Sequence, residues 1–368
     1  MTKPLRHLSF LLLASTLSHA EFFAEGSDLM MGVGSADIAR GGASTAKTSD
    51  IYAIFHNPAG LAEIKSAQLA ISTQADATLR HPNFFGLAYA FHLSDLNLKV
   101  ALAFAYIPRL MFSATGTYKE KDFESIFLRY PLPDLSKNFS GNLNSSTDEY
   151  RFAAAVSPIY NRYWSLGLSV GSVNCATTFA GVALEDPQNF TYKSTVAHAI
   201  SFNVGTKYFV NDELTMALSV KNINSTLITE IETIDKNGRA YKHYDVEFPL
   251  DIALGAHYKP NESYEFMGDY QQIFGNYGTY SINFKMLRTG MSLHEGSFTY
   301  HGGLIVPIEL SSTGIDSLEL PFPVAPTAGL GWHHGDFDLS AAFYIHPFMS
   351  LHLGRPSPSL DLSVIYSF

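Results

Sequence analysis

The chain of 368 residues carries a formal net charge of -10 and a single cysteine, Cys175, so no internal disulfide can form. The acidic balance argues against a nucleic-acid partner, and no stretch after the N-terminus supplies the roughly 18 consecutive apolar residues of a membrane-spanning helix. Aromatic residues reach 13% while charged residues are only 16%. For an exported chain without hydrophobic helices, this composition suggests a transmembrane β-barrel.

The first twenty residues have the pattern of an export signal. A basic front that includes Lys3 and Arg6 precedes an apolar run of about ten residues, 8–17, and Ser-His-Ala at 18–20 offers a cleavage site. We therefore expect residues 1–20 to be a signal peptide that is removed. An uncleaved anchor is the alternative, although the run is short for a membrane helix.

Residues 21–65 show no strand pattern, and we interpret them as a hatch inside the barrel. The stretch GVGSADIARGGASTA at 32–46 is small and glycine-rich, which allows tight turns and close backbone approach. Asn57 followed by Pro58 is typical of a helix start, because asparagine can accept a hydrogen bond from a free amide and proline suits the first helical position. The segment has too little apolar surface to fold alone and would need walls around it.

From residue 66 to residue 368, apolar and polar residues alternate with a period of two, as in strands between two environments. The pattern predicts an all-β, antiparallel transmembrane barrel of about fourteen strands. One face of the last strand, SLDLSVIYSF, carries Leu360, Leu362, Val364, Tyr366 and Phe368. The strands are predicted near 66–79, 84–93, 97–112, 149–159, 163–180, 195–209, 213–229, 249–259, 263–274, 280–291, 296–306, 325–332, 337–348 and 359–368.

Parity along each strand separates a lipid-facing side from a lumen-facing side. In SINFKM, for example, Ile282, Phe284 and Met286 are assigned to lipid and the residues between them to the lumen. The lumen-facing cations are then predicted to be Lys99, Arg151, Lys207, Lys221 and Lys285. Most should pair with lumen carboxylates such as Asp251, and one that does not could bind a ligand carboxylate.

The connections alternate between short turns and longer links, as in bacterial barrels with periplasmic turns and external loops. If the C-terminus is periplasmic, the longer links all fall on the external side. They are predicted at 113–148, 181–194, 230–248, 307–324 and 349–358. The longest is either a surface loop or a cover over the barrel mouth that first receives a greasy ligand.

No catalytic constellation emerges from the chain, so we expect no enzyme, no cofactor and no metal site. His333 and His334 fall in a predicted tight turn without a carboxylate nearby and are interpreted as a polar turn. Cys175 falls on the small-residue face of its strand and is interpreted as an inert lumen residue.

Three features together resemble the FadL/TodX family of outer-membrane long-chain fatty acid and hydrocarbon transporters. They are the glycine-rich stretch 32–46, the segment IYAIFHNPAGLAEI at 51–64, and a strand series that ends in VIYSF. The resemblance implies a fourteen-stranded barrel with an N-terminal lumenal hatch. It also implies that hydrophobic compounds enter from outside and leave sideways through a gap at a kinked third strand.

The resemblance also suggests where the functional residues lie. Candidates for the hatch and its gating are Arg40, Gly41, Gly42, Asn57, Pro58 and Ala59. Candidates for the ligand pocket are Tyr52, Phe55, Lys99, Arg151 and Lys285, although the two aromatic residues could simply pack the hatch against the wall. Pro108 either opens the strand ladder as a lateral exit, since proline donates no hydrogen bond, or ends its strand near the rim.

We therefore expect a bacterial outer-membrane protein that passes fatty acids or hydrocarbons through a plugged barrel and releases them laterally. Its partners would be a hydrophobic small molecule and outer-membrane lipid, with no nucleic acid. Related motifs also occur in PorV-like barrels of secretion systems. The alternative is thus a barrel that transports nothing and anchors a protein partner.

Overall fold

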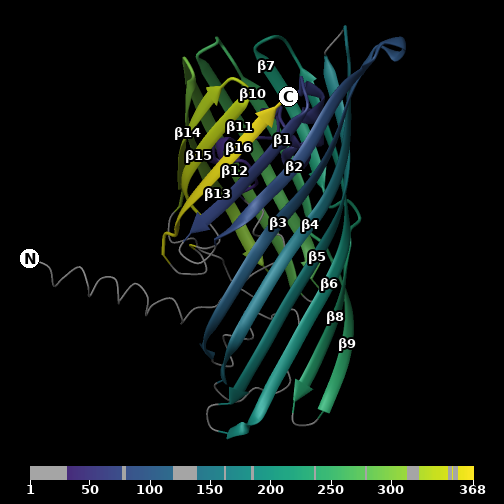
Figure 1. The fold of residues 1–368 in the computed structure, drawn as a ribbon, viewed down its shortest axis with the longest axis vertical. Helices are drawn as coiled ribbons and strands as arrows, with labels where there is room; N and C mark the ends of the chain where they lie inside the picture. The colour runs from purple at the N-terminus through teal and green to yellow at the C-terminus, as the bar shows by residue number, and fades with distance from the viewer. Residues whose placement is uncertain are drawn as a thin grey trace, which may run out of the picture.

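The computed structural model describes residues 31–76, 80–118, 139–160, 163–183, 186–235, 238–277, 280–312, 323–346, 350 and 355–368. Antiparallel β-structure dominates this part of the chain (Figure 1). The strands are β1 Gln68–Asp76, β2 Arg80–Leu93, β3 Leu98–Tyr118, β4 Phe139–Pro158, β5 Trp164–Ala183, β6 Asp186–Phe209, β7 Leu214–Lys221, β8 Thr226–Asp235, β9 Gly238–Glu247, β10 Leu250–Tyr258, β11 Tyr264–Tyr277, β12 Tyr280–Glu295, β13 Phe298–Ser312, β14 Ala325–His334, β15 Phe337–Ile345 and β16 Pro358–Ser367. The short helices are α2 Ser35–Ala39, α3 Ala53–His56, η3 Pro58–Glu63 and η4 Ser94–Leu96.

The strands close into a single antiparallel barrel. β1 pairs with β2 on one side and with β16 on the other, and β5 pairs with β6 to complete the ring. One end of β6 pairs with β7 and the other end with β8, so β7 and β8 together form one interrupted barrel strand. β9 and β10 form the next one, because they pair with β8 and β7 respectively. The result is a closed fourteen-stranded barrel, as the sequence predicted.

The two interrupted strands break at the same level of the wall. Asn222 and Asn224 adopt the left-handed backbone conformation there, with φ of 60° and 53°, which asparagine tolerates better than most residues. Asn222 Nδ2 donates to the carbonyl oxygen of Pro249 at 2.7 Å, which joins the first break to the second.

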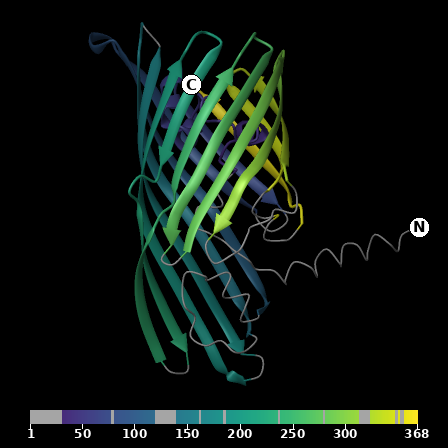
Figure 2. The same ribbon diagram turned by 180° about the vertical axis from the view of Figure 1, so that it is seen from behind.

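Two links predicted as long external loops are strand over most of their length, and parts of two others, 113–118, 139–148 and 307–312, are strand as well. β5 and β6 run through most of 181–194, and β8 and β9 form a hairpin across 226–247. In this hairpin Glu230 and Glu232 alternate with β-branched residues, as in a strand with a solvated face. Figures 1 and 2 show that β3 to β6, β8 and β9 extend well beyond β10 to β16. Residues 119–138 of the longest predicted loop lie outside the described residues.

Residues 31–67 lie inside the barrel, and we call them the hatch. Figure 2 shows this segment, in purple, enclosed by the strands near the end at which the C-terminus lies. Asn57 begins η3 as the sequence predicted: its Oδ1 accepts a hydrogen bond from the Ala59 amide at 3.1 Å, and Pro58 is the first helical residue. The predicted signal peptide and residues 21–30 lie outside the described residues.

Small side chains on the wall make room for larger ones on the hatch. The inward face of β3 carries alanine at three successive positions, and these pack against aliphatic hatch residues. The cluster includes Ala101, Ala103 and Ala105 from the wall and Ile51, Ile54 and Leu61 from the hatch. Because protein interiors pack densely, the small wall residues leave space that the larger hatch residues fill. The hatch and the wall therefore share one apolar core.

The outer face carries an apolar band that starts at an aromatic rim. On β5, exposed apolar side chains alternate outward from Trp164 to Val170, and Ser172 follows. The six residue steps from Trp164 to Val170, on a strand tilted by about 40°, rise about 16 Å along the barrel axis, which is a large part of the roughly 25 Å height of a lipid-facing band. Among the described residues, no helix has the length and apolarity needed to cross a membrane.

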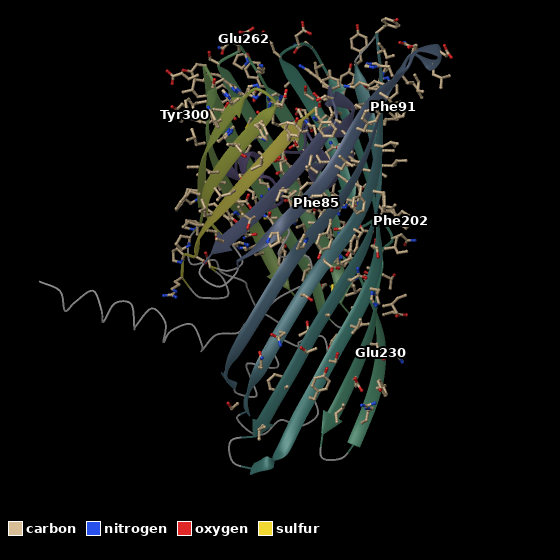
Figure 3. All side chains as sticks on the ribbon, in the orientation of Figure 1. Phe85, Phe91, Phe202, Glu230, Glu262 and Tyr300 are labelled. Carbon is tan, nitrogen blue, oxygen red and sulfur yellow. The ribbon has the colours of Figure 1, made fainter. Side chains whose placement is uncertain are left out.

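Figure 3 shows how labelled side chains are arranged along the length of the barrel. Phe91 and Tyr300 lie toward the end with the short turns, Phe85 and Phe202 lie further along the outer face, and Glu230 lies beyond them on the extended hairpin. Phe202 is 52% exposed on the outer face, whereas Asn203 next to it is 2% exposed. This band indicates a barrel set in a bilayer.

Candidate functional site

Beyond the hatch, the polarity of the wall is reversed, with apolar residues inside and polar residues outside. On β12, Ile282, Phe284 and Met286 are buried. The same face continues with Arg288, whose Nη1 donates to the carbonyl oxygen of Gly41 in the hatch at 3.1 Å. This face therefore points into the lumen.

Inward apolar residues from β5 round to β15 form one buried cluster, which we call the collar. Each member is 8% exposed or less. The wall contributes Val173, Cys175, Ala197, Ala199, Leu227, Phe248, Ile273, Ile282, Phe284, Met286, Ile305, Ala325, Ala342 and Tyr344, and the hatch contributes Met31, Ile38 and Ala39. The chemistry of these side chains matches an uncharged, apolar molecule better than water or an ion.

The prediction that Lys285 faces the lumen was wrong. Lys285 lies on the outer face of β12, where its Nζ pairs with Glu309 at 2.6 Å and the neighbouring Asn283 Nδ2 donates to the same carboxylate at 3.0 Å. The alternation of β12 was assigned with its apolar face toward lipid. Because the collar is apolar inside the barrel, the assignment is reversed, and Lys285 is removed from the pocket.

A chain of polar contacts crosses the outer face of β4, β5 and β6 just past the apolar band. Asn174 Nδ2 donates to Asp148 Oδ1 at 3.1 Å, and Asn174 Oδ1 lies 2.9 Å from His198 Nδ1. On β5, Asn174 alternates with the collar residues Val173 and Cys175. The collar therefore lies at the edge of the apolar band that is remote from the short turns.

The hatch rests directly on the backbone of the wall at inward-facing glycines. A Cβ added to Gly205 would lie 1.9 Å from Asn57 Oδ1, and one added to Gly167 would lie 2.2 Å from the Ala59 amide nitrogen. Asn57 Nδ2 also donates to the carbonyl oxygen of Thr206 at 3.2 Å. The Asn57-Pro58-Ala59 turn is thus seated on β5 and β6, and no side chain fits between them.

The glycine pair of the hatch makes a similar contact with β12 and β13. Gly41 and Gly42 have φ of +70° and +69°, which favours glycine. A Cβ on Gly303 would lie 2.2 Å from the Gly41 amide nitrogen, and one on Gly290 would lie 2.4 Å from the carbonyl oxygen of Arg40. Two separate turns of the hatch, at Gly41 and at Asn57, therefore need glycine in the wall.

A buried carboxylate organises the interior of the hatch. Asp37 forms an ion pair with Arg40 and accepts hydrogen bonds from Ser44 Oγ at 2.8 Å and Thr48 Oγ1 at 2.6 Å. His56 Nε2 lies 3.7 Å from Asp37 and 2.8 Å from the carbonyl oxygen of Val33. Burial lowers the pKa of His56 to about 4, against the opposing pull of Asp37, so the ring is neutral at pH 7.

Polar side chains from strands around the wall hold the hatch from outside. The contacts include Asp269 Oδ2 with the amides of Ser44 and Thr45, Asp361 Oδ1 with Ser35 Oγ, Thr327 Oγ1 with the Gly41 amide, Glu265 with Lys47, and Lys207 with Glu63. Leaving a buried polar group unpaired is costly in free energy, and undocking the hatch would leave several of these groups unpaired at once.

The two hatch aromatics proposed for the pocket pack against the wall. The Phe55 ring lies between Arg151, 5.4 Å from its centroid, and Lys221, 4.9 Å away, a geometry that suits cation–π attraction. Tyr52 packs on the ring of Phe84 from β2, with 4.7 Å between centroids. Both are 2% exposed.

The remaining lumen cations also have partners. Arg151 pairs with Glu149 at 2.7 Å and donates to the carbonyl oxygen of Ile54 at 3.1 Å. Lys221 pairs with Asp251 at 3.1 Å, which is the kind of pair the sequence predicted. Lys99 lies opposite Ser157, toward the short-turn end of β3, far along the strand from the collar level.

Beside the hatch, the ladder between β2 and β3 stops before either strand ends. Its last pair is Phe85 with Tyr106. Beyond it, Arg80–Phe84 runs along β1 and Ile107–Tyr118 runs along β4. We call this unpaired stretch the seam. Pro108 lies inside β3 at the seam, so it does not end the strand.

Both strands have a reason to separate at the seam. Pro82 and Pro108 lack the N–H that a continued ladder would need. The register between β1 and β2 shifts at Asn83, and that between β3 and β4 shifts at Arg109. A bulge bends its strand and raises the local twist, so two bulges at one level draw the strands apart.

The expectation about His333 was also incomplete. Its Nδ1 lies 2.6 Å from Asp338 Oδ1, across the exposed β14–β15 hairpin. A carboxylate therefore lies beside His333, which the sequence pattern of the turn did not predict. Within the described residues, no group of histidine, cysteine and carboxylate side chains is arranged to hold a metal ion.

The sequence reasoning missed three elements of the site. These are the collar, the wall glycines and Phe84. Glycines at inward positions of otherwise regular strands, such as Gly303 and Gly205, were a usable signal, because glycine inside a strand often marks a close backbone approach. The collar had no such signal, since alternation alone does not tell which face is inside.

Comparison with known proteins gives no sequence match, either to a protein-family model or to a curated protein. Solved structures do match. The Ralstonia pickettii toluene transporter TbuX superposes with a TM-score of 0.64 at 12% identity, over 92% of this chain and 99% of that one. The Pseudomonas putida toluene transporter TodX superposes with a TM-score of 0.61 at 13% identity, over 95% of this chain and 99% of that one. A Pseudomonas aeruginosa FadL homologue superposes with a TM-score of 0.62 at 11% identity, over 91% of this chain and 98% of that one.

The fold and site define a plugged barrel, a closed antiparallel wall with an apolar outer band and a segment of its own chain inside the lumen. More particularly, the chain has the fold of the FadL/TodX-type barrels, as the motifs in its sequence suggested. The solved structures of this fold named above include transporters of toluene.

Proposed function

We propose that this protein carries hydrophobic small molecules, hydrocarbons or long-chain fatty acids, into the bacterial outer membrane and releases them sideways. A ligand would enter from the end opposite the short turns, bind in the collar and leave through the seam. The hatch would close the direct route along the barrel axis.

The observation that carries the proposal is the collar. A polar lumen would suit a water-filled pore, whereas a cluster of buried apolar side chains offers water and ions no polar partner. The position of the collar next to the edge of the apolar band supports a short path from collar to membrane. The toluene transporters with the same fold make an uncharged hydrocarbon the first ligand to test.

The test is uptake of labelled toluene and labelled oleate by cells that lack the gene and are complemented with a variant. Phe284→Gln places an amide in the collar, and burying an unpaired polar group costs about 1–3 kcal/mol, so uptake should fall by about tenfold or more. Lys285→Gln changes the next residue on the outer face and should leave uptake unchanged. Equal uptake with and without the gene would overturn the proposal.

The same cells test the non-transporting alternative. If the deletion strain takes up both compounds normally and the protein copurifies with one protein partner in equal amounts, the barrel is a structural partner. In that case Phe284→Gln should leave the complex intact.

A further inference from the structure

At the seam, the wall is closed by side chains rather than by backbone hydrogen bonds. On the β2 side, both Asn83 and Phe84 point inward, because the register shift against β1 pairs Ser72 with Phe84 and Thr73 with Pro82. In a regular strand, two consecutive residues would point to opposite faces. The bulge therefore places an extra inward side chain beside the end of the ladder.

Hydrogen bonds fix the bulge in place. Asn83 Oδ1 accepts from Ser72 Oγ at 2.5 Å, and Asn83 Nδ2 donates to Asp361 Oδ2 at 2.6 Å. The other oxygen of Asp361 accepts from Ser35 Oγ of the hatch. The position of the Phe84 ring is thus tied to β1, to β16 and to the hatch.

The Phe84 ring fills the inner side of the seam. It is 0% exposed and packs in one apolar cluster with Ile107, the first β3 residue past the ladder, and with Ile51 and Tyr52 of the hatch. A Cβ on Gly86 would lie 2.6 Å from the Phe84 ring, so glycine at 86 makes the space that the ring occupies.

We propose that Phe84 is the gate of the lateral path and sets the width of the molecule that can leave the barrel. This inference rests on the proposed function, because it deepens the release step. A rotation of one aromatic side chain away from Ile107 opens the seam where no ladder hydrogen bond has to break. A ring held between Tyr52 and Gly86 has little room, so slender or flat molecules pass more readily than bulky ones.

Phe85 provides a matched control at the next position. It is 44% exposed on the outer face, it forms the last ladder pair, and its removal leaves the inner side of the seam intact. Phe84→Ala removes the gate, and Phe84→Leu retains most of the apolar volume in case the alanine variant does not fold.

The experiment measures transfer of toluene and of the bulkier pyrene from outside into proteoliposome lipid. For Phe84→Ala, pyrene transfer should rise by about tenfold relative to toluene, at the low end of what steric pockets discriminate. Phe84→Leu should lie between that variant and the wild type, and Phe85→Ala should match the wild type. An unchanged pyrene-to-toluene ratio in both Phe84 variants, or an equal change in Phe85→Ala, would overturn the gate.

A separate readout distinguishes failure of the gate from failure of transport. Binding of labelled toluene to the purified protein, compared between the wild type and Phe284→Gln, reports collar occupancy without transfer. Wild-type protein with neither binding nor transfer contradicts the proposed function and the gate together. Binding and transfer with an unchanged size ratio contradict the gate alone.

Discussion

At the scale of single residues, the closest contacts between hatch and wall occur at glycines. A Cβ on Gly205 would meet Asn57 Oδ1 at 1.9 Å, and the atom it would meet is held by its own hydrogen bond to the Ala59 amide. The hatch can yield only by moving the whole turn. These contacts hold the Asn57-Pro58-Ala59 motif in place, and its role in gating stays a prediction.

Gly205→Ala should loosen the docked hatch by about 1–3 kcal/mol, the usual cost of overpacking a filled site. Hydrogen exchange of the amides of η3 should be faster by the corresponding factor. The control is Gly268→Ala on β11, where the nearest atom to an added Cβ lies 3.7 Å away. Equal exchange in the two variants would show that Gly205 is not a close contact.

The neutral His56 makes hatch docking depend on pH. Its pKa is about 4 when docked and near 6.5 when exposed, so the undocked form binds a proton first as the pH falls. Docking should weaken between pH 6.5 and pH 4, by about 3 kcal/mol in total, and change little from this source above pH 7.

The measurement compares the wild type with His56→Gln by hydrogen exchange of the hatch from pH 7 to pH 4, corrected for the intrinsic exchange rate. The variant should lose this part of the pH dependence. Burial also raises the pKa of Asp50 to about 7, but that group is present in both proteins and cancels in the difference. Parallel pH profiles would contradict the assignment to His56.

At the scale of elements, β12 shows that one strand can serve two environments. Toward the short turns, its outward residues, such as Leu287 and Met291, belong to the apolar band. Beyond the hatch, its outward residues are Lys285 and Asn283, and its inward residues line the collar. Alternation persists along the strand while the environments on its two faces change.

Cysteine labelling should reveal this arrangement directly. In a Cys175→Ser background, Lys285→Cys in a nanodisc should react readily with a membrane-impermeant maleimide. Phe284→Cys should react far more slowly, because that position is 1% exposed inside the collar. Faster labelling at position 284 than at 285 would restore the face assignment that the sequence suggested.

At the scale of the whole molecule, the hatch lies in the lumen, where we propose that it closes the route along the barrel axis. Hatch residues contact strands around the ring, and their polar atoms are bonded to wall side chains on several sides. The intact protein in a planar bilayer should therefore show no steady ionic conductance. Deleting residues 31–64 should raise the conductance above that of the intact protein, and a comparable current through the intact protein would contradict a fixed plug.

The sequence by itself determined the number of strands and their alternation, because a wall between two environments imposes a period of two on every strand. It also determined the plug and its Asn57 cap, since Gly, Asn and Pro have local conformational preferences that act within a few residues. These signals need no knowledge of distant contacts.

Only the tertiary structure decided which face of β12 is inside, because a period of two is identical for either assignment. It also decided the seat of the hatch and the seam. Gly205 contacts Asn57, which is about 150 positions away in the sequence. Asn83 in β2 contacts Asp361 in the last strand of the barrel. Contacts of that separation arise only when the ring closes around the segment that fills it.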